Sequence, residues 1–314
     1  MRRLVCCGIL MASTAIPLAA RAESPTPADR QIGGILKRAQ QFRELQITQD
    51  EEIKLGAAVS EKVRNRYGVV QDKAVHRYVA LVGALLVEKS SRPNLPFTFV
   101  VLDTDGVNAF AAPGGFIHIT RGALGLMSSE AELAGVLAHE IVHVTEKHTI
   151  NAIKKSKAIQ MGAEETLSNN AALFSQLVDK TTELVMAGFG RAEELESDKV
   201  GVVLANSVGY APSGLPDFLT RLTERNKSAS EKQGLFASHP EMEERLSKIA
   251  KIIKDDKLTS EAVLADRYKA TIKFSAKPVA EITTVAEGTS GLAGGSSGKS
   301  SGTSGEAEKK EEPK

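Results

Sequence analysis

The sequence lacks tryptophan, has few aromatic residues (4%) and carries no excess of charge of either sign. Its 40 Lys and Arg residues against 39 Asp and Glu residues create no strong field that would favour nucleic acid as a partner. So few aromatic rings also argue against a surface on which bases would stack. The composition over 314 residues, 42% hydrophobic and 25% charged, is typical of a globular protein and excludes a collagen, a coiled-coil rod and a wholly disordered chain.

The only two cysteines, Cys6 and Cys7, lie within a segment that has the pattern of an export signal. Residues 1–22 combine two early arginines, an apolar stretch and a small-x-small cleavage pattern that ends at Ala22. An uncleaved membrane anchor is the alternative, but the apolar stretch is shorter than the roughly 18 residues that a spanning helix needs. We therefore predict cleavage after Ala22 and a protein that resides in the bacterial periplasm.

The hydrophobic pattern predicts a mainly α-helical protein with a small mixed β-sheet, which is an α+β fold. Two segments rich in aromatic and β-branched residues predict strands at 97–102 and 116–120. Apolar residues at helical spacing predict helices over residues 31–45, 50–66, 72–89, 129–148, 150–190, 192–208, 213–225 and 241–254. Residues 288–314 are rich in Gly and Ser and end in a charged run, which predicts a disordered tail.

The strongest chemical signal is the segment His139-Glu140-Ile141-Val142-His143, within the helix expected at 129–148. Positions four residues apart share one face of a helix, so both imidazoles can reach a single metal ion. Glu140 is rotated by about 100° from His139, where it can take a proton from a metal-activated water. The alternative is a helix whose histidines only satisfy hydrogen bonds in the core, and the predicted helical context disfavours it.

A catalytic Zn²⁺ needs a third protein ligand and an open position for water. A chain cleaved after Ala22 has no cysteine, so this ligand must be His, Asp or Glu. Glu194 and Asp198 lie four residues apart in a predicted helix, so Glu194 can bind the metal while Asp198 accepts the N–H of a ligand histidine. The alternative for such a charged run is a solvated helix face, which we assign to Glu193 and Glu196.

These motifs resemble the HtpX/Ste-type gluzincin zinc metallopeptidases, and within them the periplasmic, Oma/BepA-like branch. The resemblance rests on His139–His143 followed by Glu194-x-x-x-Asp198, and it covers roughly residues 45–255. One departure is Ser197, where many members carry Ala. Three further segments are similar to family motifs: Glu52-Ile53-x-Leu-Gly56, Asn108-Ala109-Phe110 with Pro113-Gly114-Gly115, Ile117 and Gly122, and Ser238-His239-Pro240 with Arg245.

The resemblance implies a zincin-type domain in which the active-site helix lies under an edge strand. It implies that His139, His143 and Glu194 hold one Zn²⁺ per chain, that Glu140 is the general base and acid, and that Asp198 supports a ligand histidine. It also implies that the edge strand pairs with an extended substrate by β-augmentation. The residues expected to bind substrate in this way are Asn108, Ala109, Phe110, Ala111 and Gly114.

His239 has two functional interpretations within this resemblance. It lies near the metal in the family, where it can stabilise the oxyanion or occupy the open coordination position as a latch. The alternative is a turn histidine without a role. Arg245, which we count with Glu140 and His239 among the catalytic candidates, can pair with Asp198 or with the developing oxyanion.

The remaining histidines receive structural interpretations. His76 lies on a surface helix, and His118 is a packing choice on a strand. His148 lies on the same predicted helix as the motif, five residues after His143 and therefore half a turn from the metal face.

Together, these patterns predict an exported zinc endopeptidase in envelope protein quality control, with extended or misfolded proteins as substrates and peripheral association with the outer-membrane assembly machinery. The rival hypothesis is a chaperone or assembly factor whose peptidase is latent because His239 closes the zinc site. A purely structural metal site is a third option, which Glu140 disfavours. The expected segments are a signal peptide (1–22), an N-terminal extension with a helix (23–45), the metallopeptidase domain (46–258), a C-terminal extension (259–287) and the tail (288–314).

Overall fold

The computed structural model describes residues 47–155, 171–227, 239, 242–278 and 281. These residues all belong to the unit that begins at Gln46. The expected signal peptide, N-terminal extension and Gly/Ser-rich tail lie outside the described residues. None of the helices within these ranges combines the length and the hydrophobicity of a bilayer-spanning segment.

A three-stranded sheet forms the framework of the described unit. Its strands are β1 (Thr98–Leu102), β2 (Ala109–Ala112) and β3 (Phe116–Thr120), in the order β1-β3-β2. β3 is parallel to β1 and antiparallel to β2, so β2 forms one edge of a mixed sheet. The strands predicted at 97–102 and 116–120 are confirmed, and with them the predicted mainly α fold with a small mixed sheet.

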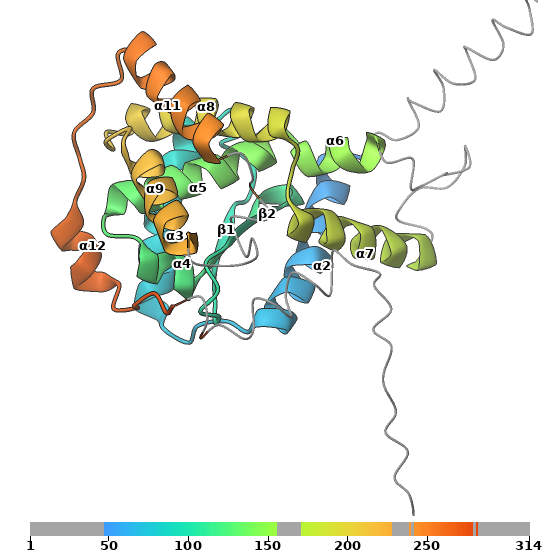
Figure 1. The fold of residues 1–314 in the computed structure, drawn as a ribbon. Helices are drawn as coiled ribbons and strands as arrows, with labels where there is room; N and C mark the ends of the chain where they lie inside the picture. Colours follow the sequence, from blue (N-terminus) through green and yellow to red (C-terminus); the bar gives the residue numbers. More distant parts are fainter. Residues whose placement is uncertain (1–46, 156–170, 228–238, 240–241, 279–280, 282–314) are drawn as a thin grey trace, which may run out of the picture. The chain divides into compact units, whose positions relative to one another are not determined.

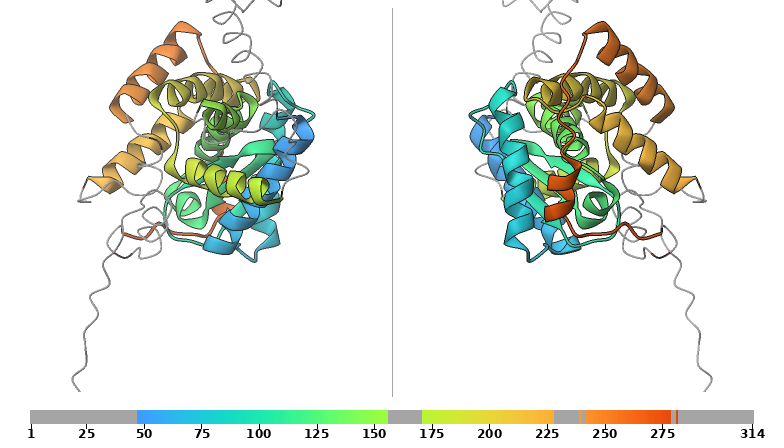
Figure 2. Two further views of the ribbon diagram at one scale, coloured as in Figure 1. Left: turned by 90° about the vertical axis from the view of Figure 1, so that its right-hand side faces the viewer. Right: turned by 90° about the vertical axis from the view of Figure 1, so that its left-hand side faces the viewer.

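Helices cover both faces of this sheet (Figure 1). Alternate side chains of a strand point to opposite faces, and β2 follows this rule. Ala109 and Ala111 join the core that contains α3 (Lys73–Lys89) and α5 (Glu130–Thr145). The alternate residues of β2, Phe110 and Ala112, join a second core with α2 (Gln49–Tyr67) and α7 (Ala171–Ala187). Figure 2 (left) shows α7 crossing the sheet.

α2 is held against the turn that links β2 to β3, the short 3-10 helix Pro113–Gly115. A Cβ atom on Gly56 would lie 1.8 Å from the Pro113 carbonyl oxygen, so only glycine allows this approach. The buried Glu52 carboxylate accepts the Gly114 N–H at 3.1 Å and forms a two-point ion pair with Arg92 at 2.9 Å. The segment Glu52–Gly56 therefore sets the position of the edge strand.

α5 is buried along its whole length and contacts α3, α8 (Arg191–Ser207) and α9 (Gly214–Asn226). Its start is capped by Ser129, whose side chain accepts the Glu132 N–H at 3.2 Å. α8 passes very close to α5, because a Cβ on Gly201 would lie only 3.0 Å from the His139 nitrogen. The absence of a side chain at Gly201 thus brings the two helices together at the metal motif.

The remaining helices pack around α5 and α8. α11 (Met242–Asp255) contacts α8 and α9, while α12 (Ala265–Thr271), which the sequence pattern did not predict, contacts α3 and α5. The other described helices are α4 (Arg121–Leu126) and α6 (His148–Lys155). Glu130, in the first turn of α5, accepts hydrogen bonds from Tyr210 at 2.6 Å and from Arg267 Nε of α12 at 2.7 Å.

The prediction of one helix over residues 129–148 is wrong. α5 ends at Thr145, Lys147 adopts a positive φ of 58°, and His148 begins the separate helix α6. A residue in the left-handed region interrupts a right-handed helix, so helical spacing cannot be counted across it. The helix expected over 150–190 corresponds to α6 and α7, with residues 156–170 outside the described ranges.

His118 provides a test of this packing. The ring is fully buried on β3, its Nε2 lies 2.8 Å from the Ser60 hydroxyl, and burial lowers its pKa from 6.5 to about 4. Between these values the unfolded chain binds a proton that the folded chain does not, so stability is lost as the pH falls from 6.5 towards 4. The free energy of unfolding, measured in urea, should fall in both proteins between about pH 7 and pH 4.5. We expect this fall to be about 2 to 3 kcal/mol smaller in the double variant Ser60→Ala/His118→Leu than in the wild type. Equal losses in the two proteins would contradict the assignment.

Candidate metal centre

Four side chains from three parts of the chain converge on one point. His139 and His143 come from α5, Glu194 from the first turn of α8, and His239 from the residues that precede α11. Each offers one ligand atom, these atoms lie within 4.8 Å of one another, and all four residues are buried. The structure therefore brings together the three predicted ligands and adds His239 to them.

The spacing of these atoms suits a tetrahedral ion. The two Nε2 atoms of His139 and His143 are 3.0 Å apart, and they lie 3.5 and 3.4 Å from the Glu194 carboxylate oxygens. Nδ1 of His239 lies 3.3 Å from Nε2 of His139 and 2.9 Å from Glu194. Ligands at 2.0–2.1 Å from a tetrahedral Zn²⁺ are separated by about 3.3 Å, so the donor set fits this ion.

Glu140 lies beside this donor set without a competing partner. Among the described residues, neither of its buried carboxylate oxygens has a hydrogen-bond partner, and Nε2 of His239 lies 3.8 Å from Oε1 of Glu140. A buried carboxylate without partners is costly. Such a group is therefore expected to act on a molecule that enters the site.

A buried ion-pair network supports the donors from the side of α11. Arg245 forms a two-point ion pair with Asp198, with both N–O distances at 2.7 Å, and its Nη1 lies 3.0 Å from Glu194. Oδ1 of Asp198 in turn lies 3.0 Å from Nδ1 of His139. Of the two partners considered for Arg245, the structure places it on Asp198, and Asp198 stands at the outer nitrogen of a histidine in the donor set.

The neighbours of each group set the direction of its pKa shift. Burial raises the pKa of Glu194, but the nearby imidazoles of His239, His139 and His143 outweigh it and hold this pKa well below its usual range. Burial lowers the pKa of His139, but Asp198 and Glu194 outweigh it and raise this pKa to about 9. For His143 burial prevails and its pKa is well below 6.5, whereas burial raises the pKa of Glu140. The site thus favours an ionised Glu194 beside a neutral His143.

The residues expected to bind substrate are less accessible than their predicted role requires. Asn108 is 5% exposed, all four residues of β2 are buried, and the Gly114 N–H is bonded to Glu52. A narrow gap, too small to hold a water molecule, lies between Ala111–Pro113 and α6, and His143 lines it as well. The edge strand and the donor set therefore share a boundary, but this gap has no room for a peptide.

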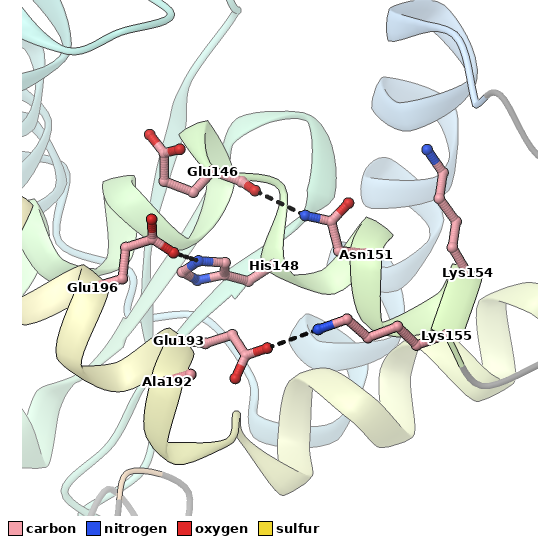
Figure 3. Close-up of a pocket in the computed structure, with 8 residues that line it drawn as sticks. All are labelled: Glu146, His148, Asn151, Lys154, Lys155, Ala192, Glu193 and Glu196. Carbon is pink, nitrogen blue, oxygen red and sulfur yellow. Dashed lines mark hydrogen bonds and ion pairs between the residues drawn. The ribbon is translucent and has the colours of Figure 1, made fainter.

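Two contacts of the donor set have no counterpart in the sequence prediction. His148 lies against His143 and contacts Glu196, although spacing along one continuous helix places it away from the metal. His148 and Glu196 line an open cleft of about 470 Å³. Figure 3 draws these two residues together with the Glu193–Lys155 pair, which lines the same cleft. Only the break between α5 and α6 brings His148 back, and no sequence pattern signals the positive φ at Lys147.

This geometry defines a class of protein. It is a mainly helical α+β protein in which one helix carries the pattern His-Glu-x-x-His, and a glutamate from a second helix completes the set of metal-binding side chains. The comparison with known families agrees. Residues 73–253 match Peptidase family M48, and the chain belongs to this family. The resemblance to HtpX/Ste-type metallopeptidases is confirmed.

The chain is similar to three curated proteins of this kind. The β-barrel assembly-enhancing protease of Escherichia coli K12 is 26% identical over 209 residues, which is 63% of this chain and 42% of that protein. Metalloprotease YcaL of the same organism is 30% identical over 159 residues (49% and 61%). Mitochondrial metalloendopeptidase OMA1 of Schizosaccharomyces pombe is 24% identical over 209 residues (65% and 61%). The chain thus spans less than half the length of the first of these relatives.

Removal of Arg245 tests the ion-pair network. Arg245→Leu leaves two buried carboxylates without their cation, so we expect the free energy of unfolding of the metal-free protein to fall by about 3 to 5 kcal/mol in urea titrations. Arg191→Leu is the matched control, because Arg191 also joins α8 to α11, through Glu244, but at the surface. A loss from Arg245→Leu no larger than that of the control would refute the network's contribution.

Proposed function

We propose that this protein is an exported, zinc-dependent endopeptidase that acts in protein quality control in the bacterial envelope. The observation that carries the proposal is the convergence of His139, His143 and Glu194 beside the Glu140 carboxylate, which has no hydrogen-bond partner among the residues that the structure describes. A purely structural metal site has no use for such a carboxylate. Membership of Peptidase family M48 supports a hydrolytic role.

His139, His143 and Glu194 would hold the metal, and we propose Zn²⁺ because two imidazoles and one carboxylate are a common catalytic donor set for it. When bound, Zn²⁺ supplies Lewis-acid polarisation of the scissile carbonyl and makes a neighbouring water acidic. Asp198 keeps the outer nitrogen of His139 oriented, and Arg245 keeps Asp198 and Glu194 in place.

Glu140 is the proposed general base and then the general acid. It takes the proton of the attacking water and delivers it to the leaving amine, so no covalent intermediate with the protein forms. Burial raises the pKa of Glu140, which makes it a stronger base than an exposed carboxylate and helps it to retain the proton until transfer. The lack of a competing hydrogen bond leaves both oxygens of this carboxylate available.

His239 is proposed to be a latch. Its Nδ1 lies among the donor atoms, 2.9 Å from Glu194, and its Nε2 is directed towards Glu140 at 3.8 Å. In this position the imidazole takes the place that a water and a substrate carbonyl need. Cleavage therefore requires His239 to withdraw. The interpretation of His239 as an oxyanion-stabilising group is less well supported, since Nδ1 of its ring already contacts the Glu194 carboxylate at 2.9 Å.

The edge strand β2 is the proposed docking site for an extended substrate. A strand can add to β2 because β2 pairs with β3 on one side only, and it borders the His143 ring. The narrow gap between Ala111–Pro113 and α6 must widen before a peptide enters. Unfolded or extended chains are the substrates that suit such a site, because their backbone groups are free to pair.

The proposed setting is the periplasm. Its support is the signal pattern of residues 1–22 and the similarity to a relative named β-barrel assembly-enhancing protease. We propose peripheral association with outer-membrane assembly as a partner relation of this chain. The rival hypothesis, a chaperone whose peptidase is latent, is not favoured, because the relatives are named as proteases and metalloendopeptidases.

The first test replaces Glu140. Glu140→Gln keeps the volume of the side chain but removes its basicity, so we expect one equivalent of zinc to remain bound while casein cleavage falls by at least about 10²-fold. Zinc is measured by mass spectrometry of the purified protein and cleavage by release of labelled peptide. Glu194→Ala is the companion variant, and it is expected to lose the metal as well as the activity. Full proteolysis by Glu140→Gln would refute the proposed base.

The second test addresses the latch. His239→Ala frees a donor position without removing His139, His143 or Glu194, so we expect casein cleavage to increase severalfold over the wild type. The control is the double variant His239→Ala/Glu140→Gln, which must be inactive if the gain comes from this site. A fall in activity with zinc retained would show that His239 assists the reaction rather than blocking it.

A further inference from the structure

We infer that His148 and Glu196 form an outer anchor of the metal centre that holds the ring of His143 in its metal-facing orientation. Neither residue has a role in the predicted site, where His148 is structural and Glu196 a solvated charge. The inference rests on the proposed zinc centre and extends it to a positioning role for these two residues.

The two nitrogens of His143 face different partners. Nε2 faces the donor set, 3.0 Å from Nε2 of His139 and 3.4 Å from Glu194. Nδ1 faces His148 and lies 2.9 Å from Nδ1 of that ring. Nε2 of His148 then lies 3.1 Å from Oε2 of Glu196. The chain of contacts therefore runs from the metal position through two imidazoles to one carboxylate.

The chemistry of each group sets the direction of the hydrogen bonds. A ring nitrogen that binds a metal carries no proton, so the proton of His143 resides on Nδ1 and is donated to His148. Nδ1 of His148 must then be the acceptor, which places the proton of this ring on Nε2. A carboxylate can only accept, and Glu196 accepts this proton. One arrangement of protons thus satisfies the contact of His143 with the metal position, the contact between the two imidazoles and the contact of His148 with Glu196. It also fixes which nitrogen of His143 is presented to the metal.

Local structure holds both rings in place. The positive φ at Lys147 turns the chain so that His148, the first residue of α6, returns to the end of α5. Phe189 stacks on His143 with centroids 4.2 Å apart and an interplanar angle of 17°, and it also lies 5.8 Å from the His148 ring. His143 and His148 are both buried, so their contact is shielded from water.

The two histidines of α5 consequently have different outer anchors. Asp198, at the outer nitrogen of His139, is fully buried and neutralised by Arg245. Glu196 is 54% exposed and lies in the open cleft drawn in Figure 3. A hydrogen bond is weaker at an exposed site than in the interior. His148 is therefore the main element of the second anchor, and Glu196 makes the smaller contribution.

The experiment measures zinc affinity by competition with a fluorescent chelator. We expect His148→Ala to weaken zinc binding by about 10- to 100-fold, and Glu196→Ala to weaken it by less than about tenfold. His148→Asn should restore most of the loss, because its amide oxygen can accept the His143 proton near the original Nδ1 position. Glu193→Ala is the matched control: Glu193 lines the same cleft but pairs with Lys155, so affinity should stay at the wild-type value.

Two readouts separate positioning from a general loss of structure. Thermal unfolding of each metal-free variant reports on the fold alone. The d–d absorption bands of the Co²⁺-substituted protein report on ligand orientation, and we expect them to shift in His148→Ala and to return in His148→Asn. Wild-type affinity in His148→Ala would overturn the inference, as would a loss that His148→Asn fails to restore.

The wild-type protein supplies the reference for the function itself. One equivalent of zinc without any cleavage of casein would refute the proposed peptidase while leaving the anchor to be judged by affinity. Active wild-type enzyme together with unchanged affinity in His148→Ala would refute the anchor and leave the peptidase intact. The two failures are therefore distinguishable.

Discussion

The structure depends on the balance of charge around the buried carboxylate of Glu194. Glu140, Glu194 and Asp198 place three carboxyl groups in the interior, and the Arg245 guanidinium contacts the last two of them. The pKa values of Glu194 and Asp198 are lowered, and Arg245 together with the raised pKa of His139 places positive charge beside these two carboxylates. Buried charges without compensation are costly. The same cluster of histidines and Glu194 can hold a metal ion.

Close helix packing makes this concentration of charge possible. Gly201 lets α8 approach the backbone of His139, which brings Glu194 and Asp198 to the two histidines of α5. Gly56 similarly lets α2 approach the turn beside β2. In each case a glycine, which has no side chain, allows a close approach of the backbone, and this approach positions the functional residues nearby. The approach of α8 to α5 is why the donor atoms lie within 4.8 Å of one another.

The same site combines groups that hold and groups that act. Asp198 and His148 lie at the outer nitrogens of His139 and His143. Glu140 has no hydrogen-bond partner within the described part of the chain, and His239 enters the donor set from a separate segment. In the proposed function, the ligands need a rigid orientation while Glu140 and His239 remain free to act. Under the same proposal, the narrow gap beside the edge strand would have to open before a substrate binds.

The sequence by itself determined the parts that follow from helical periodicity. His139, Glu140 and His143 lie on one helix, and Glu194 and Asp198 on another, so their spacing within each helix was predictable from 3.6 residues per turn. Tertiary structure decided everything that joins distant segments: Arg245 on Asp198 rather than on an oxyanion, His239 inside the donor set, and β2 buried rather than open. The position of His148 depends on tertiary structure, although the residue is close to the metal motif in the sequence. It is only five residues from His143, but the left-handed residue between them cancels the helical count, and its position depends on how α6 packs.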